Sequence, residues 1–337
     1  MKEPAVWFPA IRTGTGTDVF TERLVDGLKK RGVRAEISWL PLRAEYLPWS
    51  VAVPRCPGWA NVVHINSWLS QRFVPDNLPL VVTFHSSLYD PVLTKYKSLA
   101  QTLYHQLWGR SLERQSIRSA NVVTAVSRYA ANHAEKAFQC SQVVPIYNGV
   151  DTEKFSPPIH RDQHKPFRLL FVGNVSRRLK GADLLVPIME LLGADYELRI
   201  TGKLIDIPGN NSLPSNIIEL GRLASPDDVV TAYRSCDALL FPTRLEGFGL
   251  VALEAQSCGL PVIATNGSAL PEVVEHEVTG LLCEMDSVDA FVGAARRLKN
   301  EKERWVEMSV AARAKAESIF SESATLEKYI ALYMQII

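Results

Sequence analysis

The fold of this chain is decided by the segment Phe241-Pro-Thr-Arg-Leu-Glu246-Gly-Phe-Gly-Leu-Val-Ala-Leu-Glu254-Ala-Gln-Ser-Cys-Gly-Leu-Pro-Val-Ile-Ala-Thr265. The apolar run Ala238–Pro242 predicts a strand, and Pro261–Thr265 predicts a second one. Between them lie the glycine loop Gly247-Phe248-Gly249 and an apolar helical run. A strand, a glycine loop and a helix in this order form a ligand-binding edge of a parallel sheet.

The loop and its two glutamates suit a ligand that carries both an anion and hydroxyl groups. Glycines let main-chain N–H groups approach an anion at a helix N-terminus. Glu246 and Glu254, eight positions apart, can accept hydrogen bonds from the hydroxyls of a sugar or a ribose. The alternative is a helix with an acidic first turn, in which Glu254 is solvated.

Length and composition indicate a soluble globular protein of roughly two domains, since the chain has 337 residues, 47% hydrophobic and 22% charged. No apolar run reaches the ~18 residues of a membrane-spanning helix. The N-terminus lacks the features of a secretory signal. Five scattered cysteines, none in Cys-x-x-Cys, argue against disulfides or a zinc site and fit a reducing cytoplasm.

Charge is unevenly distributed along the chain. Residues 1–157 hold 18 Lys+Arg and 12 Asp+Glu, a net charge of +6, whereas the remainder holds 19 and 24, a net charge of −5. Six of the seven tryptophans also lie in the first half. A basic half rich in aromatics can face an anionic surface, a lipid headgroup or a sugar. The alternative is that the tryptophans belong to the core and the charge is evenly spread.

The first half alternates strand and helix patterns. The helices are predicted near Asp18–Lys30, Pro91–Arg118 and Arg128–Phe138. The strands are predicted at Ala5–Ile11, Val33–Leu40, Asn61–Ile65, Leu80–Phe84, Val122–Ala125 and Val143–Tyr147. Such alternation indicates a parallel sheet that is covered on both faces.

The pattern restarts after the proline-rich segment Ser156–Pro166, which we interpret as a linker. Lys180 and Pro226 each begin a predicted helix, and the chain reads as helix from about Ser287 onward. The further strands are predicted at Arg168–Val172, Tyr196–Thr201, Ile217–Leu220, Ala238–Phe241, Pro261–Thr265 and Gly280–Cys283. We therefore expect two doubly wound α/β domains, 1–157 and 165–317, that face a cleft, followed by a helix over 318–337.

Three further segments are candidates for chemistry. Gly14-Thr15-Gly16 opens the first helix in a tight turn that suits a phosphate, although Val19 stands where a dinucleotide fingerprint has its third glycine. Arg177, Arg178 and Lys180 form a basic loop next to a helix N-terminus and predict a diphosphate clamp. His85 follows an apolar strand, at a sheet edge where ligands bind. The alternative for Gly14–Gly16 is a simple turn, that for the basic loop is solvated cations, and that for His85 is a structural histidine.

Motifs of other enzyme classes are absent. The sequence has no Asp-x-Asp, no His-Glu-x-x-His and no Walker phosphate loop, so dependence on a divalent metal has no sequence support. The missing third glycine disfavours a dinucleotide oxidoreductase.

Taken together, the motifs resemble the retaining nucleotide-sugar glycosyltransferases of family four, which have the GT-B fold of two Rossmann-like domains. The likeness covers nearly the whole chain and is strongest from Asn148 to Gly280. Its carrying segments are Asn148-Gly-Val-Asp151-x-x-x-Phe155, Phe171-Val-Gly-(x)6-Lys180-Gly181, Glu246-Gly-Phe-Gly249, Ala252-Leu-Glu254-Ala, Pro261-Val-Ile-Ala-Thr265, Pro271-Glu-Val-Val and Thr279-Gly-Leu-Leu.

The resemblance implies that the C-terminal domain holds the nucleotide sugar and the N-terminal domain holds the acceptor. Glu254 would bond the ribose, Glu246 and the glycine loop would address the sugar and phosphate, and Lys180 would pair with the diphosphate. The implied catalytic residues are His85, Lys180 and Glu246. The implied donor-binding residues are Gly14, Thr15, Gly16, Arg177, Arg178, Lys180, Gly221, Arg222, Leu223, Glu246, Gly247, Phe248, Gly249, Leu250 and Glu254.

The implied activity is metal-independent transfer of a hexose, with retention, from a nucleoside diphosphate sugar to a glycan or lipid-linked acceptor in surface polysaccharide, lipopolysaccharide or glycolipid synthesis. No resident cofactor and no nucleic-acid partner are expected. The basic first half suggests an anionic acceptor, and the helix from Lys95 to Arg114 suggests peripheral contact with an anionic membrane on its cytoplasmic face, the alternative being a solvated helix face.

One position departs from the family pattern. Relatives commonly have an arginine directly after the glycine of Phe-Val-Gly, where this chain has Asn174. Arg177 or Arg178 can replace that charge. If neither does, the protein is a catalytically impaired nucleotide-sugar binder or a partner subunit. A sugar-nucleotide epimerase of the same fold is a further alternative, which the Glu246/Glu254 pattern disfavours.

Overall fold

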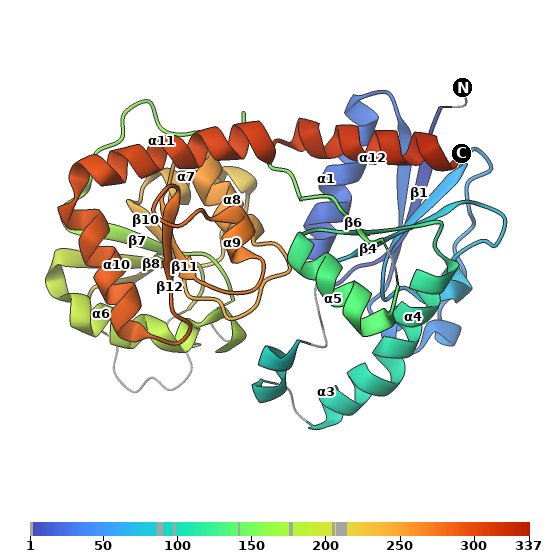
Figure 1. Cartoon of the computed structure of the whole chain (residues 1–337), viewed down its shortest axis with the longest axis horizontal. Coiled ribbons are helices and arrows are strands. Elements are labelled where there is room, and N and C mark those ends of the chain that lie inside the picture. The colour runs from blue at the N-terminus through green and yellow to red at the C-terminus, as the bar shows by residue number, and fades with distance from the viewer. Residues whose placement is uncertain are drawn as a thin grey trace. The chain divides into compact units, whose positions relative to one another are not determined.

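The computed structural model describes residues 3–85, 90–96, 99–140, 142–174, 178–203, 206 and 214–337, and the chain forms two compact units (Figure 1). Unit 1 comprises Met1–Gly149 and Glu322–Ile337, and unit 2 comprises Val150–Ser321. The chain thus leaves unit 1 before the proline-rich segment and returns to it for its last helix.

Unit 1 is built on a parallel sheet whose strands have the order β2-β1-β3-β4-β5-β6. The strands are β1 (Ala5–Ile11), β2 (Arg34–Leu40), β3 (Val62–Asn66), β4 (Leu80–Phe84), β5 (Val122–Ala125) and β6 (Val144–Pro145). Successive side chains of a strand face opposite sides, so Val6 and Phe8 of β1 lie in one apolar cluster and Trp7 lies in another. Apolar packing on both faces explains why the strands read as continuous hydrophobic runs.

Helices cover this sheet, and their bounds differ from the prediction in one region. The helices of unit 1 are α1 (Gly16–Lys30), α2 (Arg43–Tyr46), α3 (Leu99–Tyr104), α4 (Arg110–Ser119), α5 (Arg128–Phe138) and α12 (Glu322–Ile336). A single helix over Pro91–Arg118 is wrong. Pro91–Lys95 is a 3-10 turn that Asp90 caps through Val92 N–H, and a π-helical turn at His105–Gly109 separates α3 from α4.

Unit 2 repeats the architecture with the strand order β12-β11-β10-β7-β8-β9, again parallel throughout. Its strands are β7 (Phe167–Phe171), β8 (Tyr196–Ile200), β9 (Ile217–Glu219), β10 (Ala238–Phe241), β11 (Val262–Thr265) and β12 (Gly280–Cys283). Its helices are α6 (Leu185–Leu192), α7 (Pro226–Arg234), α8 (Leu250–Ser257), α9 (Leu270–Val273), α10 (Val288–Asn300) and α11 (Lys302–Ile319).

The predicted α/β class with two doubly wound sheets is confirmed. Predicted and observed strand ends agree within one residue, except that the strand expected to reach Tyr147 ends at Pro145, although Ile146 N–H still donates to the carbonyl of Ala125 in β5. The helix expected from Lys180 begins only at Leu185, because Gly181 adopts a left-handed conformation (φ +70°) between two 3-10 turns.

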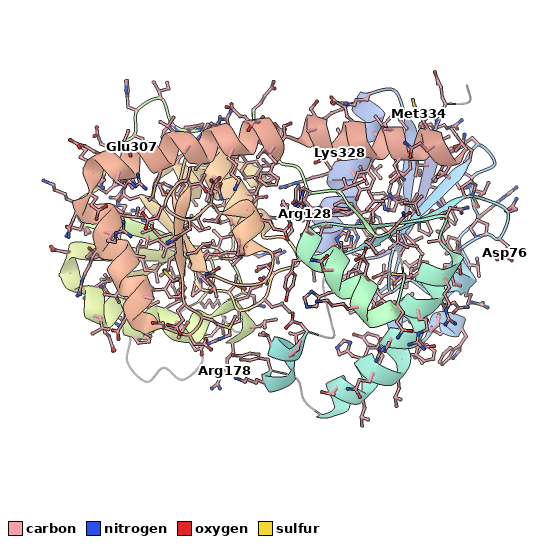
Figure 2. All side chains as sticks on the ribbon, in the orientation of Figure 1. Asp76, Arg128, Arg178, Glu307, Lys328 and Met334 are labelled. Atoms are coloured by element: carbon pink, nitrogen blue, oxygen red, sulfur yellow. The ribbon has the colours of Figure 1, made fainter. Side chains whose placement is uncertain are left out.

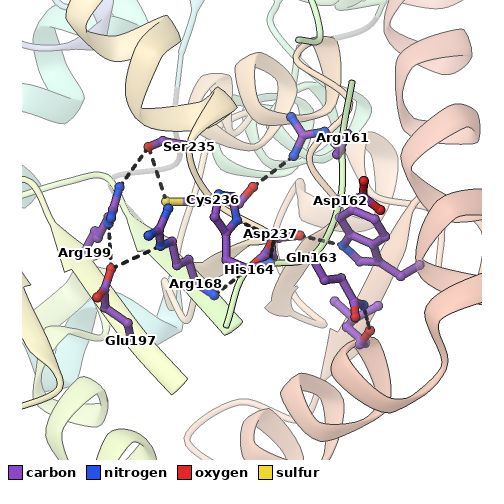
Figure 3. A network of polar contacts seen from close by, with 12 residues as sticks. Arg161, Asp162, Gln163, His164, Arg168, Glu197, Arg199, Ser235, Cys236 and Asp237 are labelled. Carbon is purple, nitrogen blue, oxygen red and sulfur yellow. Dashed lines mark hydrogen bonds and ion pairs between the residues drawn. The ribbon is translucent and has the colours of Figure 1, made fainter. Parts of the chain in front are cut away.

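A polar network fixes the proline-rich segment to unit 2 (Figure 3). The buried carboxylate of Asp237 accepts hydrogen bonds from Nδ1 of His164 (2.9 Å) and from the main-chain N–H of Arg168 (2.7 Å). Arg161 donates to the carbonyl groups of Cys236 and Cys258. Part of the segment that composition marks as a linker is therefore anchored by specific contacts.

Helix α12 is part of the core of unit 1. Leu326 lies so close to Gly27 of α1 that a Cβ at that glycine would come within 2.6 Å of the leucine. The hydroxyl of Tyr333 lies 2.6 Å from Nδ1 of His64, whose Nε2 lies 2.6 Å from Oγ1 of Thr83. His64 is 2% exposed, and burial lowers its pKa to about 3, with a smaller contribution from His85. The α12 contact with β3 therefore depends on a neutral imidazole.

Unit 1 should lose stability in acid because of this histidine. Its folded pKa lies below the usual 6.5, so its contribution is complete above pH 6.5 and is lost as pH falls toward 3. We expect a loss of roughly 2–3 kcal/mol by the middle of that window. Urea unfolding at a series of pH values, followed by tryptophan fluorescence, measures it, because six of the seven tryptophans lie in unit 1.

His64→Gln should flatten the pH dependence of unfolding, and His160→Gln, at an exposed position of unit 2, is the control that should leave it unchanged. Equal slopes in wild type and His64→Gln would contradict the assignment.

Candidate active site

Glu246 lies in the loop after β10 and is fixed by three contacts. Its Oε1 lies 2.5 Å from Nζ of Lys180 and accepts a hydrogen bond from Oγ1 of Thr243 at 3.1 Å. Its main-chain N–H donates to Oγ of Ser268 at 3.0 Å. The carboxylate is 14% exposed and the lysine side chain 29%, so this ion pair is accessible to a ligand without being fully solvated.

The glycine loop presents main chain and not side chains. Gly249 caps α8 with φ +100°, and a Cβ there would lie 2.9 Å from Leu270. Phe248 is 3% exposed and packs edge-on against Phe320, so its ring belongs to the core of unit 2. The N–H groups at the start of α8, from Leu250 onward, are therefore the groups that this loop can offer to an anion.

Glu254 is buried on α8, at 9% exposure. The hydroxyl of Tyr233 lies 3.2 Å from its Oε2 and equally far from the main-chain oxygen of Val251. A buried carboxylate needs hydrogen-bond donors. The solvated alternative for Glu254 is thus wrong, and Tyr233, which no sequence pattern indicated, provides a hydrogen bond to its carboxylate.

The basic loop is tied to the end of β10 by Arg244. This side chain is 4% exposed and donates to both oxygens of Asp183, at 2.7 and 2.9 Å, and to Asp286 at 2.5 Å. It also donates to the carbonyl of Arg178. Burial lowers the pKa of Arg244, but the hydrogen bonds with the two aspartates outweigh that effect and raise it. Its charge is thus used within the protein and positions the loop that carries Lys180.

The close approach of this loop also depends on Gly181. A Cβ at Gly181 would lie 2.1 Å from the carbonyl oxygen of Pro242, which no side chain can tolerate. Arg178 is exposed at the surface of unit 2 (Figure 2), and Arg177 lies outside the described residues. Of the three predicted clamp cations, the structure brings Lys180 against Glu246.

His85 follows β4 in unit 1 and is held by neutral groups. Its Nε2 lies 2.8 Å from Oδ1 of Asn66, and the rings of Phe20 and Trp68 pack on it with centroid distances of 4.7 and 5.9 Å. Burial lowers its pKa to about 3. At neutral pH the imidazole is therefore uncharged and can exchange hydrogen bonds but not serve as a cation.

The turn Gly14-Thr15-Gly16 opens α1 as predicted, but part of its anion-binding capacity is already used. The carboxylate of Asp18 accepts hydrogen bonds from the main-chain N–H groups of Thr13 and Gly14 at 2.7–3.1 Å. Asp18 is 7% exposed. The N–H groups of Thr15 and Gly16 remain the candidates for an external phosphate at this turn.

The segment Gly221-Arg222-Leu223 lies in unit 2 after β9, the edge strand that is separated from β10 by β7 and β8. Gly221 has φ +69° with open space around it, and Arg222 is exposed. Its contact with a nucleotide base stays a prediction.

Comparisons with known proteins bear on what this arrangement does. The family model "Glycosyl transferases group 1" matches residues 152–315, and "Glycosyltransferase Family 4" matches residues 14–154. A D-inositol 3-phosphate glycosyltransferase of Jonesia denitrificans is 30% identical over 80% of this chain and 75% of its own length. One from Catenulispora acidiphila is 29% identical over 95% of this chain and 86% of its own length.

Solved structures share the fold. Sucrose-phosphate synthase of Thermosynechococcus elongatus superposes with a TM-score of 0.79 at 18% identity, covering 98% of both chains. HepE of Anabaena in complex with UDP superposes with a TM-score of 0.74 at 16% identity, covering 98% of this chain and 100% of its own. At such identities the likeness shows the fold alone.

Substitution of Gly181 should damage unit 2 far more than substitution of Gly221. Both have a positive φ, +70° and +69°, but a Cβ at Gly221 meets open space. We expect Gly221→Ala to cost about 1 kcal/mol and Gly181→Ala about 2–4 kcal/mol, since the latter adds a clash with main chain. Calorimetric unfolding gives the difference, and hydrogen exchange should accelerate over residues 178–184 only in Gly181→Ala. Equal effects of the two substitutions would show that the close approach is absent.

Proposed function

Because this chain belongs to the group 1 glycosyltransferases, which have the GT-B fold, we propose that it transfers a hexose from a nucleoside diphosphate sugar to a hydroxyl group of an acceptor, with retention of configuration. The observation that carries the proposal is the accessible Lys180–Glu246 pair beside the glycine loop and the buried Glu254. A cation, main-chain N–H groups and a held carboxylate are the groups that a diphosphate, a sugar and a ribose require.

The donor would lie on unit 2. Glu254, which Tyr233 already holds, would accept hydrogen bonds from the ribose hydroxyls, and Glu246 would accept one from the sugar. The N–H groups at the start of α8 would bind the phosphates. The proposal draws support from HepE, whose solved complexes contain UDP and UDP-glucose.

Lys180 would neutralise the departing diphosphate, the main demand of glycosyl transfer. With no donor bound, its charge is balanced by Glu246 at 2.5 Å. An incoming diphosphate offers more negative charge and would take over the lysine. Arg244 would keep the loop that carries Lys180 in place while this exchange occurs, because its own charge is committed to Asp183 and Asp286.

Retention would follow from attack on the face from which the diphosphate leaves, with the leaving phosphate accepting the acceptor's proton. A carboxylate nucleophile is the alternative, as in retaining glycosidases. Glu246 is the carboxylate to test for that role, because a diphosphate that takes over Lys180 leaves its Oε1 with the hydrogen bond from Thr243. A covalent glycosyl adduct trapped on Glu246 would overturn the proposed course.

Unit 1 would bind the acceptor. A neutral His85 would exchange a hydrogen bond with the transferring sugar, and the N–H groups of Thr15 and Gly16 would bind the phosphate of the donor. We propose an anionic acceptor, a lipid-linked or phosphorylated glycan or polyol in surface polysaccharide, lipopolysaccharide or glycolipid synthesis. Support comes from the net charge of +6 over residues 1–157 and from relatives named for inositol 3-phosphate.

We further propose that the enzyme works in the cytoplasm, at the inner face of a membrane, where nucleotide sugars are available. All five cysteines are free thiols, as that compartment requires. Among the described residues, every helix is too short or too polar to cross a bilayer. An attachment of the described part to a membrane would therefore be peripheral.

Lys180→Ala should lower turnover by roughly two to three orders of magnitude, since one contact to a developing anion is worth ~3–4 kcal/mol. Release of nucleoside diphosphate from a panel of nucleotide sugars, with and without acceptor, provides the assay. Lys302→Ala, which removes an exposed lysine at the start of α11 in unit 2, is the control. Turnover near the wild-type value in Lys180→Ala would remove the lysine from the site.

The same assay distinguishes an active enzyme from the alternative, an impaired nucleotide-sugar binder or partner subunit. That alternative is motivated by Asn174, which stands where relatives have an arginine. Arg178, one of the two arginines that can replace the missing charge, is exposed. An enzyme releases nucleoside diphosphate slowly even without an acceptor, whereas an impaired binder binds the donor in calorimetry and releases none.

Transfer should not depend on a divalent metal. The proposed site uses Lys180 and helix N–H groups to balance the diphosphate, which is the role that a metal has in other transferases. Activity measured after treatment with EDTA should therefore stay within about twofold of the untreated value, and a loss that Mg²⁺ or Mn²⁺ restores would contradict the expectation.

A further inference from the structure

Unit 1 exposes large apolar side chains in two segments that touch each other. The loop after β2 exposes Tyr46, Leu47 and Trp49 by 48%, 46% and 62%, and the helix formed by α3 and the π-helical turn exposes Leu103 and Leu107 by 58% and 73%. Large apolar residues are normally buried, and a cluster of exposed ones marks a contact surface.

Direct side-chain contacts join the two segments into one face. The rings of Tyr46 and Tyr104 lie 5.3 Å apart, and those of Trp49 and Trp108 lie 6.0 Å apart at 84°. The indole N–H of Trp108 donates to the carbonyl of Glu45 at 3.2 Å. The loop is therefore held against the helix, and we call the combined surface, with the arginines described next, the aromatic–basic face.

The helical segment that holds these leucines leads into α4 (Figure 1), and α4 carries three arginines. Arg110, Arg114 and Arg118 recur every four residues and are all exposed. The three arginines share one side of α4, and Leu103 and Leu107 are exposed in the two turns directly before it. Of the acidic residues in the described part of these two segments, Asp90 and Glu113 are 3% and 1% exposed and Glu45 is partly buried, whereas the three arginines are exposed, so the exposed charge is mainly positive.

We infer that the aromatic–basic face binds the surface of a membrane that contains anionic phospholipids. Aromatic and aliphatic side chains beside a row of arginines match the two layers of such a surface, an apolar interior below a negative headgroup region. A basic row of this kind also argues against a second copy of the same face, because like charges would meet. The inference goes beyond the proposed chemistry, since binding to a membrane requires neither donor nor acceptor.

The pattern of exposed side chains favours a membrane surface over plain solvent as the environment of this helix face. A solvated face is polar, whereas here the two most exposed apolar residues of the helix, Leu103 and Leu107, stand one turn apart. Trp49 adds an aromatic ring with a polar edge, the kind of side chain that concentrates at the headgroup level.

Flotation of the full chain with vesicles tests the inference. We expect binding to vesicles of phosphatidylcholine with phosphatidylglycerol, much weaker binding to phosphatidylcholine alone, and loss of binding at high salt. Arg110→Gln/Arg114→Gln/Arg118→Gln should weaken partitioning on the order of 100-fold, since each cation near an anionic surface contributes about fivefold. Leu103→Gln/Leu107→Gln should weaken it by about tenfold or more.

Val306→Gln/Val310→Gln is the matched control, because it removes two exposed apolar residues of α11 in unit 2 and should leave vesicle binding unchanged. Donor hydrolysis in every variant reports on the proposed function separately, and the face variants should keep it. Absence of vesicle binding by the wild type, equal binding by the face variants, or a dimer in light scattering that only the face variants abolish would each overturn the inference.

Discussion

The candidate site depends on the ion pairs of the buried Arg244 side chain with Asp183 and Asp286. This guanidinium joins Asp183 and the carbonyl of Arg178, in the loop after β7, to Asp286 near the start of α10. Burial of charge is costly and such a cluster adds little to stability, so its value lies in fixing positions. Because Gly181 permits contact with Pro242, the loop lies against the end of β10, and Lys180 reaches Glu246.

In each unit, acidic side chains are held by groups that a ligand can join or replace. Glu254 has the hydroxyl of Tyr233, and Glu246 has Lys180. At the turn that opens α1, Asp18 accepts hydrogen bonds from the main-chain N–H groups of Thr13 and Gly14. These two groups are therefore not available to an external anion. Preorganised groups of this kind lower the cost of reorganisation when charge develops.

Sequence periodicity predicted both sheets and nearly all strand ends, because strands buried on both faces read as apolar runs. It failed where local geometry overrides pattern, as at Pro91 and Gly181, where capping and a left-handed turn interrupt the expected helices. Tyr233 and Arg244 were missed because their contacts join segments distant in sequence. Arg244, two positions before Glu246, belongs to no spacing pattern in the sequence. Glu246 and Glu254 stand out because they lie eight positions apart.

The most direct test of the account is a structure of the protein with a nucleoside diphosphate sugar bound. The account predicts the ribose hydroxyls within hydrogen-bond distance of Glu254 and the diphosphate against Lys180 and the first N–H groups of α8, with Arg244 still bonded to Asp183 and Asp286. A nucleotide bound elsewhere in unit 2, with the Lys180–Glu246 pair intact and Glu254 untouched, would contradict it.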